Sequence, residues 1–525
     1  MEEEDIIMNK EKNMDIITQN KIVSYILDDW KILLFLVAIY SIYYYGTYNY
    51  DYFEKKGISY IKPIIFVGSL WKRVTKQISY KDYQLYVYNH FKGKPFGGIF
   101  LGRRPTLFII DPDLIKAITT RDFEYFVDRN SLETAEPRFL KRTLLNLKGS
   151  QWKAVRSAIT PSFSSSRLKN MIPLIQQSSD QMVKFLQQYD KSDVEMKDLV
   201  GHLTLEVIGA CAFGIKTDAL TDENAHFVKL AKQFGDLTSK RKVFLLVFIM
   251  FMPNLMKYFN LSFLNTDAIE ELVKVLKVTK AERRKAESKK RDFLQQIIEA
   301  ADKEREEAEK TGAVIQLDED TIDGQSFLFL IAGYETSSTL LSFGIHILAV
   351  NPELQKKLRE HILQVTEGKE ITYELLTELD YLEGFLLETL RLHPPLSRVD
   401  RVCVKDYVIP GTNVTLEAGR VVAISVYGVH MDPDIYPEPH EFRPERFMGE
   451  ERKNRPSHLY LAFGAGPRNC IGMRFAMISA KIAMVSLLKN FKFSPCDKTE
   501  NPVNVDRDSV LLKPAAGLWV KLEKL

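Results

Sequence analysis

Cysteine is scarce in this chain of 525 residues, which contains four: Cys211, Cys403, Cys470 and Cys496. None of them forms a C-x-x-C pair, so a disulfide framework is excluded and the composition favours a reducing compartment. Glycine (26 residues) and proline (21 residues) are too few for a collagen-like or low-complexity protein. The net charge of +3 gives no indication of binding to nucleic acid. With 45% hydrophobic and 27% charged residues, we expect a globular chain with a large buried core.

Long hydrophobic runs are also rare, and one of them is long enough to cross a bilayer. Ile32 to Tyr50 is a stretch of 19 residues without a charge, and as a helix it would reach about 28 Å. Its first half is aliphatic, and its second half holds tyrosines, which favour the headgroup boundary: Tyr40, Tyr43, Tyr44, Tyr45 and Tyr48. Acidic residues precede the run and no small-residue cleavage site follows it. The run therefore predicts a retained transmembrane anchor rather than a signal peptide, with a buried core helix as the alternative.

The anchor divides the chain into four predicted parts: an acidic leader 1–31, the anchor 32–50, a linker 51–68 and a catalytic body 69–525. Basic residues close to the span are evenly balanced. Slightly further out the basic excess lies on the body side, which favours a cytosolic body, and the reducing compartment supports it: Lys72, Arg73, Lys76 and Lys81. A second apolar run, Val243 to Met252, is too short to span a bilayer. It belongs either to the core or to a surface that dips into the membrane.

The body is expected to be mainly α-helical with a small β-rich part. Hydrophobic periodicity and cap residues predict three long helices: Ser326–Val350, Tyr373–Leu392 and Met473–Leu488. Alternating residues predict short strands, at Gly98–Leu101, at Thr106–Ile110 and, in antiparallel pairs, between Val399 and Val426. This order differs from the strict strand–helix alternation of a parallel α/β protein.

The most informative segment is Phe463 to Gly472, Phe-Gly-Ala-Gly-Pro-Arg-Asn-Cys-Ile-Gly, which places Cys470 just before a predicted helix. Backbone N–H groups at a helix start stabilise a negative sulfur, so we expect a lowered pKa for this thiol. Gly466 and Gly472 permit a tight backbone and leave room for a flat ligand. A lone thiolate suits the axial position of a haem iron better than tetrahedral zinc. A buried structural cysteine behind a glycine-rich turn is the alternative.

The first long helix contains an acid next to an alcohol, Glu335-Thr336, after Ala332-Gly333-Tyr334. A glycine beside a threonine can open a local groove, with the hydroxyl turned from its own backbone toward a ligand. The acid and the alcohol then give a short route for protons. A surface glutamate and a threonine bonded to its own helix are the alternative.

Two further pairs have helical spacing. Glu388 and Arg391 are three residues apart and lie on one helix face. Trp152 and Arg156 place an indole donor and a guanidinium group one turn apart. Taken alone, each pair is equally typical of an ordinary protein surface.

The pattern Phe-x-x-Gly-x-Arg-x-Cys-x-Gly around Cys470 resembles the haem-binding loop of the cytochrome P-450 family, the haem-thiolate monooxygenases. The resemblance covers about residues 55 to 525. The loop and Phe213-Gly214-Ile215 are most similar to animal microsomal members that oxidise lipophilic compounds. The resemblance implies the cytochrome P-450 fold, haem b (iron protoporphyrin IX) and Cys470 as the proximal iron ligand. One departure is the segment Gly57 to Gly68, which holds one proline where members have a proline-rich hinge.

The resemblance also implies roles for the other motifs. Glu335 and Thr336 are expected to deliver protons during oxygen activation, and Glu388, Arg391 and Arg446 are expected to form a structural network. Phe463 and a set of propionate-binding residues are expected to contact the haem: Trp152, Arg156, Arg129, Arg401 and Arg468. The expected substrate pocket is apolar and includes Ile331, Ala332, Leu396, Ser397 and Val399.

The sequence holds no flavin or nicotinamide motif, so electrons from NADPH are expected to arrive through NADPH–cytochrome P-450 reductase, with cytochrome b5 as a second partner. Basic residues suggest part of the docking face, with an ordinary solvated surface as the alternative: Lys141, Arg142, Lys148 and Lys153. The predicted location is the endoplasmic reticulum membrane, and the predicted reaction inserts one oxygen atom into xenobiotics, steroids or fatty-acid-like compounds. The alternatives are a haem-thiolate isomerase or lyase that works without a reductase, and a non-catalytic haem sensor.

Overall fold

The structure is a computed structural model that describes residues 14, 18, 30–131, 137–222, 228–230, 266–285 and 292–525. Most of the predicted acidic leader lies outside the described residues, and so does the apolar run Val243 to Met252. The predictions made for these two segments therefore stay predictions.

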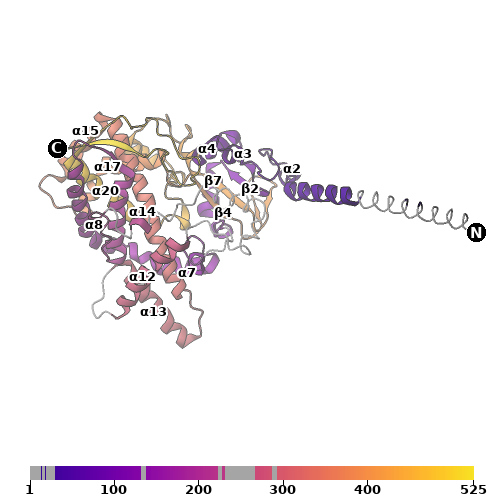
Figure 1. The fold of residues 1–525 in the computed structure, drawn as a ribbon, viewed down its shortest axis with the longest axis horizontal. Coiled ribbons are helices and arrows are strands. Elements are labelled where there is room, and N and C mark those ends of the chain that lie inside the picture. Colours follow the sequence, from indigo (N-terminus) through magenta and orange to yellow (C-terminus); the bar gives the residue numbers. More distant parts are fainter. Residues whose placement is uncertain are drawn as a thin grey trace, which may run out of the picture.

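Ten longer helices build most of the described body (Figure 1): α4 Tyr80–Phe91, α7 Gly149–Ile159, α8 Ser165–Leu186, α9 Met196–Ile208, α12 Thr266–Lys285, α13 Phe293–Thr311, α14 Glu319–Val350, α15 Pro352–Thr366, α17 Asp380–Leu392 and α20 Met473–Asn490. Shorter helices connect them: α2 Tyr52–Lys55, α3 Trp71–Val74, α5 Pro112–Lys116, α6 Arg138–Lys141, α16 Tyr373–Glu378, α18 Val426–His430 and α19 Gly449–Asn454. The predicted predominance of helix is confirmed.

The strands form three small sheets. The largest has the order β1-β2-β7-β4, with β1 Phe96–Leu101, β2 Arg104–Ile109, β7 Val421–Ser425 and β4 Arg398–Val402. Within it β2 and β7 are parallel, and the outer pairs are antiparallel. The second sheet has the order β3-β9-β8, with β3 Asp193–Glu195, β9 Trp519–Lys524 and β8 Phe491–Ser494; the third pairs β5 Tyr407–Val408 with β6 Thr415–Leu416. The predicted strands are present, but the parallel β2–β7 pair was not foreseen.

Helix α14 runs through the middle of the helical region (Figure 1). It begins seven residues before the predicted start because the Asp318 carboxylate accepts a hydrogen bond from the Thr321 amide at 2.8 Å and caps the helix. Its residues belong to two core clusters, one shared with α8, α9, α17 and α20 and the other with α7, α12 and α13. The Glu335 and Thr336 pair therefore lies on the central helix of the body.

The predicted helix Tyr373–Leu392 is wrong in one respect, because the structure divides it into α16 and α17 at Leu379. Leu379 has non-helical backbone angles (φ −82°, ψ 62°) and is fully buried in the core. Helix α17 then begins at Asp380, which places the Asp380 and Glu383 carboxylates in its first turn, where negative charge is favoured. The predicted start of α20 at Met473 is confirmed.

The first long described element is the apolar helix Trp30–Thr47, which extends away from the body next to α2 (Figure 1). By length and composition it could cross a membrane, and 6% of its residues are buried. Helix α14 passes the same test but is half buried inside the body. The segment that follows this helix is packed on the body, because Phe53 and Ile58 lie in the same core cluster as the four-stranded sheet.

Candidate functional site

Cys470 lies at the end of a tightly turned loop. Its amide donates to the Phe463 carbonyl at 2.8 Å, which closes the loop, and α20 begins three residues later. Gly466 has a φ of +69°, and a Cβ atom there would lie 1.7 Å from the Thr119 carbonyl oxygen. Glycine at this position therefore admits the neighbouring backbone. A Cβ at Gly472 would make only an ordinary contact of 3.9 Å with the Phe163 ring, so the two glycines have different roles.

The predicted lowering of the Cys470 pKa is wrong for the protein alone. The side chain is accessible at the surface of the loop, but the surrounding protein desolvates the sulfur and raises the thiol pKa. The Gly472 amide, Arg156 and Arg129 act in the opposite direction without overcoming desolvation. One backbone N–H group and two guanidinium groups thus act on the sulfur, and a cation bound to it would add the remaining stabilisation of its anionic form.

Four arginines converge beside this loop, and we call them the arginine cluster: Arg129, Arg156, Arg401 and Arg468. Burial and the neighbouring arginines lower the pKa of Arg401 and that of Arg468 to about 9. Among the described residues, the cluster has one ion pair, between Arg468 and Asp128 at 3.8 Å. The cluster is therefore a concentration of buried positive charge.

Two members of the arginine cluster have buried donors without an acceptor in the described part of the chain. These are Nε of Arg129 and both Nε and Nη2 of Arg401. The nearby Asp400 carboxylate pairs with Arg398 at 2.8 Å instead. Buried donors without acceptors cost free energy, and an anionic ligand with several oxygen atoms would satisfy them. Two carboxylates beside a metal-binding sulfur, as a haem provides, fit this donor set.

The other predicted haem contacts, Arg156, Arg468 and Trp152, have partners within the protein. Arg156 holds the loop, because its guanidinium group donates to the backbone and side-chain oxygens of Asn469, both at 3.0 Å. Arg468 donates to the carbonyl groups of Val127, Leu144 and Leu147 at 2.8–3.0 Å. It also stacks on Trp152, with its guanidinium carbon 4.1 Å from the ring centroid. Each of the three guanidinium nitrogens of Arg468 therefore donates one hydrogen bond to the backbone. The second hydrogens of Nη1 and Nη2 remain available to a ligand.

The predicted orientation of Thr336 is wrong. Its hydroxyl donates to the Ala332 carbonyl at 2.7 Å, within its own helix, because that acceptor is always within reach of a helical threonine. Glu335 is bound by a residue that the sequence did not reveal: Lys197 on α9 lies 2.6 Å from its carboxylate and 3.0 Å from the Thr339 hydroxyl. Lys197 is 138 residues from Glu335 in the chain, so no local pattern indicated this pair.

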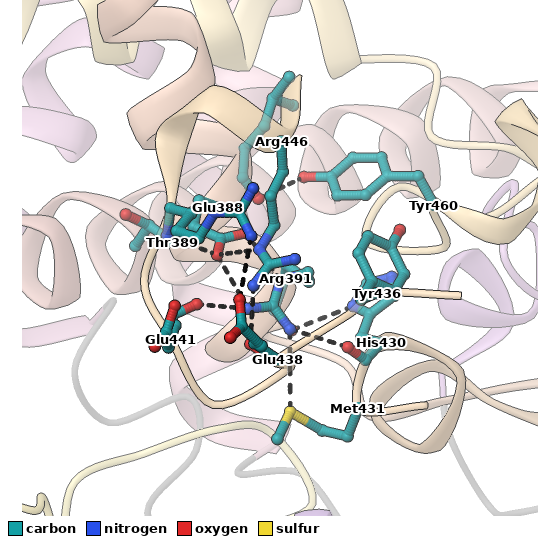
Figure 2. A network of polar contacts seen from close by, with 12 residues as sticks. Glu388, Thr389, Arg391, His430, Met431, Tyr436, Glu438, Glu441, Arg446 and Tyr460 are labelled. Carbon is teal, nitrogen blue, oxygen red and sulfur yellow. Dashed lines mark hydrogen bonds and ion pairs between the residues drawn. The ribbon is translucent and has the colours of Figure 1, made fainter. Parts of the chain in front are cut away.

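The side chains Glu388, Arg391 and Arg446, which we call the glutamate–arginine network, meet at one carboxylate (Figure 2). Arg391 donates to both oxygens of Glu388 at 2.6 and 2.8 Å, and Arg446 donates at 3.2 Å. All three side chains are fully buried. The remaining arginine donors reach backbone carbonyls: those of His430, Glu441, Pro437 and Glu438.

His430 connects the glutamate–arginine network to the cysteine loop. Its Nε2 accepts a hydrogen bond from the Leu461 amide at 2.9 Å, so Nδ1 carries the proton and donates to the Arg391 carbonyl at 3.1 Å. The ring stacks on Tyr460 with 5.5 Å between centroids, and both residues appear beside the network in Figure 2. Burial lowers the pKa of His430 to about 3. No local sequence pattern indicates this residue, because its partners are distant in the chain.

The predicted pocket residues differ in accessibility. Leu396 and Ala332 are exposed, and Ile331 and Val399 are half-buried. Ser397 is fully buried, and its carbonyl accepts hydrogen bonds from the first residues of α18. Of the predicted basic docking residues, Lys141, Lys148 and Lys153 are exposed, whereas Arg142 is paired with Asp318 at 3.4 Å.

A mainly helical body thus carries an accessible cysteine beside buried arginine nitrogens that have no acceptor among the described residues. A family model described as cytochrome P-450 matches residues 59–520. Cytochrome P-450 9e2 of Blattella germanica is 37% identical over 511 residues, which cover 92% of this chain and 95% of that protein. Probable cytochrome P-450 6a14 of Drosophila melanogaster is 35% identical over 94% of this chain and 100% of its own length.

A mammalian relative is cytochrome P-450 3A9 of Rattus norvegicus, which is 34% identical over 509 residues, 95% of this chain and 97% of its own. The chain therefore belongs to the cytochrome P-450 family. This membership makes it a haem-thiolate monooxygenase with a haem-iron cofactor.

Proposed function

We propose that this protein is a membrane-anchored monooxygenase that receives NADPH electrons through cytochrome P-450 reductase and inserts one oxygen atom into lipophilic small molecules. Xenobiotics, steroids and fatty-acid-like compounds are the proposed substrate classes. The observation that carries the proposal is the accessible Cys470 beside the arginine cluster with its unsatisfied donors. Family membership supplies the reaction class.

In this proposal Cys470 binds the iron of haem b, and Phe463 packs beside it. Arg129 and Arg401 bind the propionates through their unpartnered nitrogens. Arg156 and Arg468 keep the loop in place and add positive charge, and Trp152 supports Arg468 from below. When bound, the haem supplies the activation of dioxygen.

Glu335 and Lys197 form the proposed proton-handling pair. Lys197 holds the carboxylate of Glu335 on one side of α14. Thr336 follows in the chain, and its hydroxyl keeps a hydrogen bond to Ala332. Because a hydroxyl that donates to the backbone can still accept, Thr336 is able to orient a water or a substrate group while Glu335 exchanges a proton at its second oxygen.

The proposed reductase contact uses the exposed lysines Lys141, Lys148 and Lys153. Lys141 ends α6, Lys148 precedes α7 and Lys153 lies within α7. Helix α7 also carries Trp152 and Arg156, which lie beside the cysteine loop. An acidic partner that docks there would therefore approach the side of the body that holds the loop. Cytochrome b5 is a second candidate for the same surface.

The helix Trp30–Thr47 is the proposed single-pass anchor in the endoplasmic reticulum membrane, with the body in the cytosol. Its support is the exposure of the large apolar side chains from Ile32 to Tyr44, which are between 47% and 66% exposed. A soluble protein rarely exposes so large an apolar surface. The half-buried or exposed Ile331, Ala332, Leu396 and Val399 are the proposed substrate contacts.

The test combines the full-length protein with NADPH–cytochrome P-450 reductase in phospholipid vesicles. NADPH and oxygen consumption are measured with panels of steroids, fatty acids and lipophilic xenobiotics, and products are identified by mass spectrometry. We expect a hydroxylated or epoxidised product with at least one class, and none from Cys470→Ser. Rearrangement of a lipid peroxide without NADPH would instead indicate an isomerase, and haem binding without oxygen consumption would indicate a sensor.

A further inference from the structure

A cavity of about 420 Å³ lies between the anchor helix and the tip of the β1–β2 hairpin. Aromatic and hydroxyl side chains of the helix form one wall, and Arg103 of the hairpin forms the other: Tyr40, Ser41, Tyr44, Tyr45, Tyr48 and Arg103. The rings of Tyr40, Tyr44 and Tyr48 follow one another along the helix, with centroids 6.3 and 5.9 Å apart. The wall is therefore an amphipathic tyrosine ladder with one cation opposite it.

Arg103 is the charged residue of this cavity. Its guanidinium carbon lies 3.6 Å from the centroid of the Tyr45 ring, and Nη1 donates to the Tyr45 carbonyl at 3.1 Å. No carboxylate within the described ranges pairs with Arg103. One face of the guanidinium group is thus covered by the ring, while its other N–H groups remain for a ligand.

The two walls are held in a fixed relation. The Tyr50 hydroxyl at the end of the anchor donates to the Ile64 carbonyl at 2.9 Å. Gly46 packs so closely on Phe66 that a Cβ atom would lie 2.4 Å from the ring. Gly68 in turn pairs with Leu101 beside the hairpin tip. The cavity is consequently formed before any ligand enters, which lowers the entropic cost of binding.

We propose that this cavity binds one anionic glycerophospholipid, with its phosphate on Arg103 and its glycerol and ester groups among the tyrosine hydroxyls. The inference rests on the membrane placement proposed above. Tyrosine side chains favour the headgroup level of a bilayer, which puts Arg103 at the depth of the phosphates. A guanidinium group recognises phosphate through two parallel hydrogen bonds. A purely apolar ligand would leave these donors without acceptors.

The experiment titrates the detergent-solubilised full chain with phosphatidylinositol and counts bound lipids by native mass spectrometry. We expect one retained phosphatidylinositol per chain and an affinity at least about fivefold lower in Arg103→Gln. Arg104→Gln is the matched control, because Arg104 is the next residue and is exposed. We expect it to bind as the wild type does.

Three results would overturn the proposal. Equal losses of phosphatidylinositol affinity in the two variants would show only long-range attraction between the lipid and positive charge. Retention of phosphatidylcholine equal to that of phosphatidylinositol would show an apolar groove. Displacement of the lipid by inorganic phosphate would show a site for the free anion. Flotation with phosphatidylcholine vesicles separates this proposal from membrane placement. A wild-type chain that fails to float contradicts the anchor, whereas one that floats without retaining phosphatidylinositol contradicts the lipid site alone.

Discussion

The glutamate–arginine network and the arginine cluster both bury arginines in the same body, but they differ in what surrounds the positive charge. In the network two guanidinium groups share the Glu388 carboxylate, and their other bonds reach backbone carbonyls. In the cluster four guanidinium groups lie near one another, and Arg129 and Arg401 have buried nitrogens without acceptors. The network is complete within the protein, whereas the cluster needs a ligand.

This difference indicates that the network stabilises the fold, whereas the cluster is suited to binding a ligand. Removing one partner from a complete buried network leaves an uncompensated charge, so the network contributes to the stability of the fold. The cluster lowers the stability of the protein alone through desolvation and mutual repulsion, and an anionic ligand recovers that free energy on binding. Substitutions in the two regions are therefore expected to have opposite effects on the stability of the haem-free protein.

The first prediction concerns the network. Arg391→Leu should lower the free energy of unfolding by about 3–5 kcal/mol, because Glu388 stays buried with one arginine fewer. Arg452→Leu is the control: Arg452 pairs with Glu383 at 2.9 Å, but its side chain is 56% exposed. Its loss should cost about 1 kcal/mol or less. Denaturant unfolding of both variants measures the difference, and equal losses would contradict a supporting role for the network.

The second prediction compares two glycines of the cysteine loop. Gly464 and Gly466 have nearly equal φ values of +72° and +69°, so alanine should cost about 1–2 kcal/mol at each through backbone strain. Only at Gly466 does the new Cβ also collide with the Thr119 carbonyl. Gly466→Ala should therefore be the more destabilising variant by thermal denaturation. A loss no larger than that of Gly464→Ala would show that this close approach is relaxed in solution.

The third prediction concerns the cluster, where removal of an arginine should not lower the free energy of unfolding. Arg401→Leu should leave the stability of the haem-free protein unchanged or raised, because it removes a buried charge without a carboxylate partner. The same variant should bind haem at least about tenfold more weakly, since one charge-assisted contact is worth about 1.5–3 kcal/mol. Haem titration and denaturant unfolding of the haem-free chain measure the two effects. A haem-free variant that loses as much stability as Arg391→Leu would remove the contrast.

The fourth prediction concerns acid. The pKa of His430 is about 3 in the folded protein, against 6.5 for an ordinary histidine. Below pH 6.5 the unfolded chain therefore binds a proton that the folded chain does not, and stability falls as the pH drops toward 3. The slope for this residue is at most about 1.4 kcal/mol per pH unit.

His430→Gln should make the decline between pH 6.5 and pH 5 shallower, because glutamine offers a donor and an acceptor but does not titrate. His90 is exposed near the end of α4, so His90→Gln serves as the control. Melting temperatures measured across this range give both slopes. Parallel slopes in the wild type and His430→Gln would show that His430 does not couple acid to unfolding.

Local sequence patterns predicted contacts between residues within one helix turn. They did not indicate contacts between residues that are distant in the sequence. The spacing of Glu388 and Arg391 indicated one face of a helix, and the structure places them in contact. Arg446 came from family resemblance, because its 58-residue separation from Glu388 leaves no periodic signal. His430 and Lys197 were missed for the same reason: their partners are distant in sequence, and nothing near either residue indicates a special role.

The errors also have physical causes. The start of α14 was placed too late because its first turn is polar and is fixed by the Asp318 cap rather than by apolar periodicity. The Thr336 hydroxyl was expected to face a ligand, whereas its own helix offers an acceptor at 2.7 Å. The thiol pKa of Cys470 was judged from the helix start alone, and the desolvation that outweighs it depends on the folded surroundings.

The most direct test of the account is the absorption spectrum of the reduced, carbon-monoxide-bound protein. The wild type and Cys496→Ser, a control at a partly exposed cysteine away from the loop, should both show the strongly red-shifted Soret band of a thiolate-ligated ferrous haem. Cys470→Ser should lack that band. A red-shifted band that survives Cys470→Ser, or a wild-type protein that binds no haem, would contradict the assignment of Cys470 as the iron ligand.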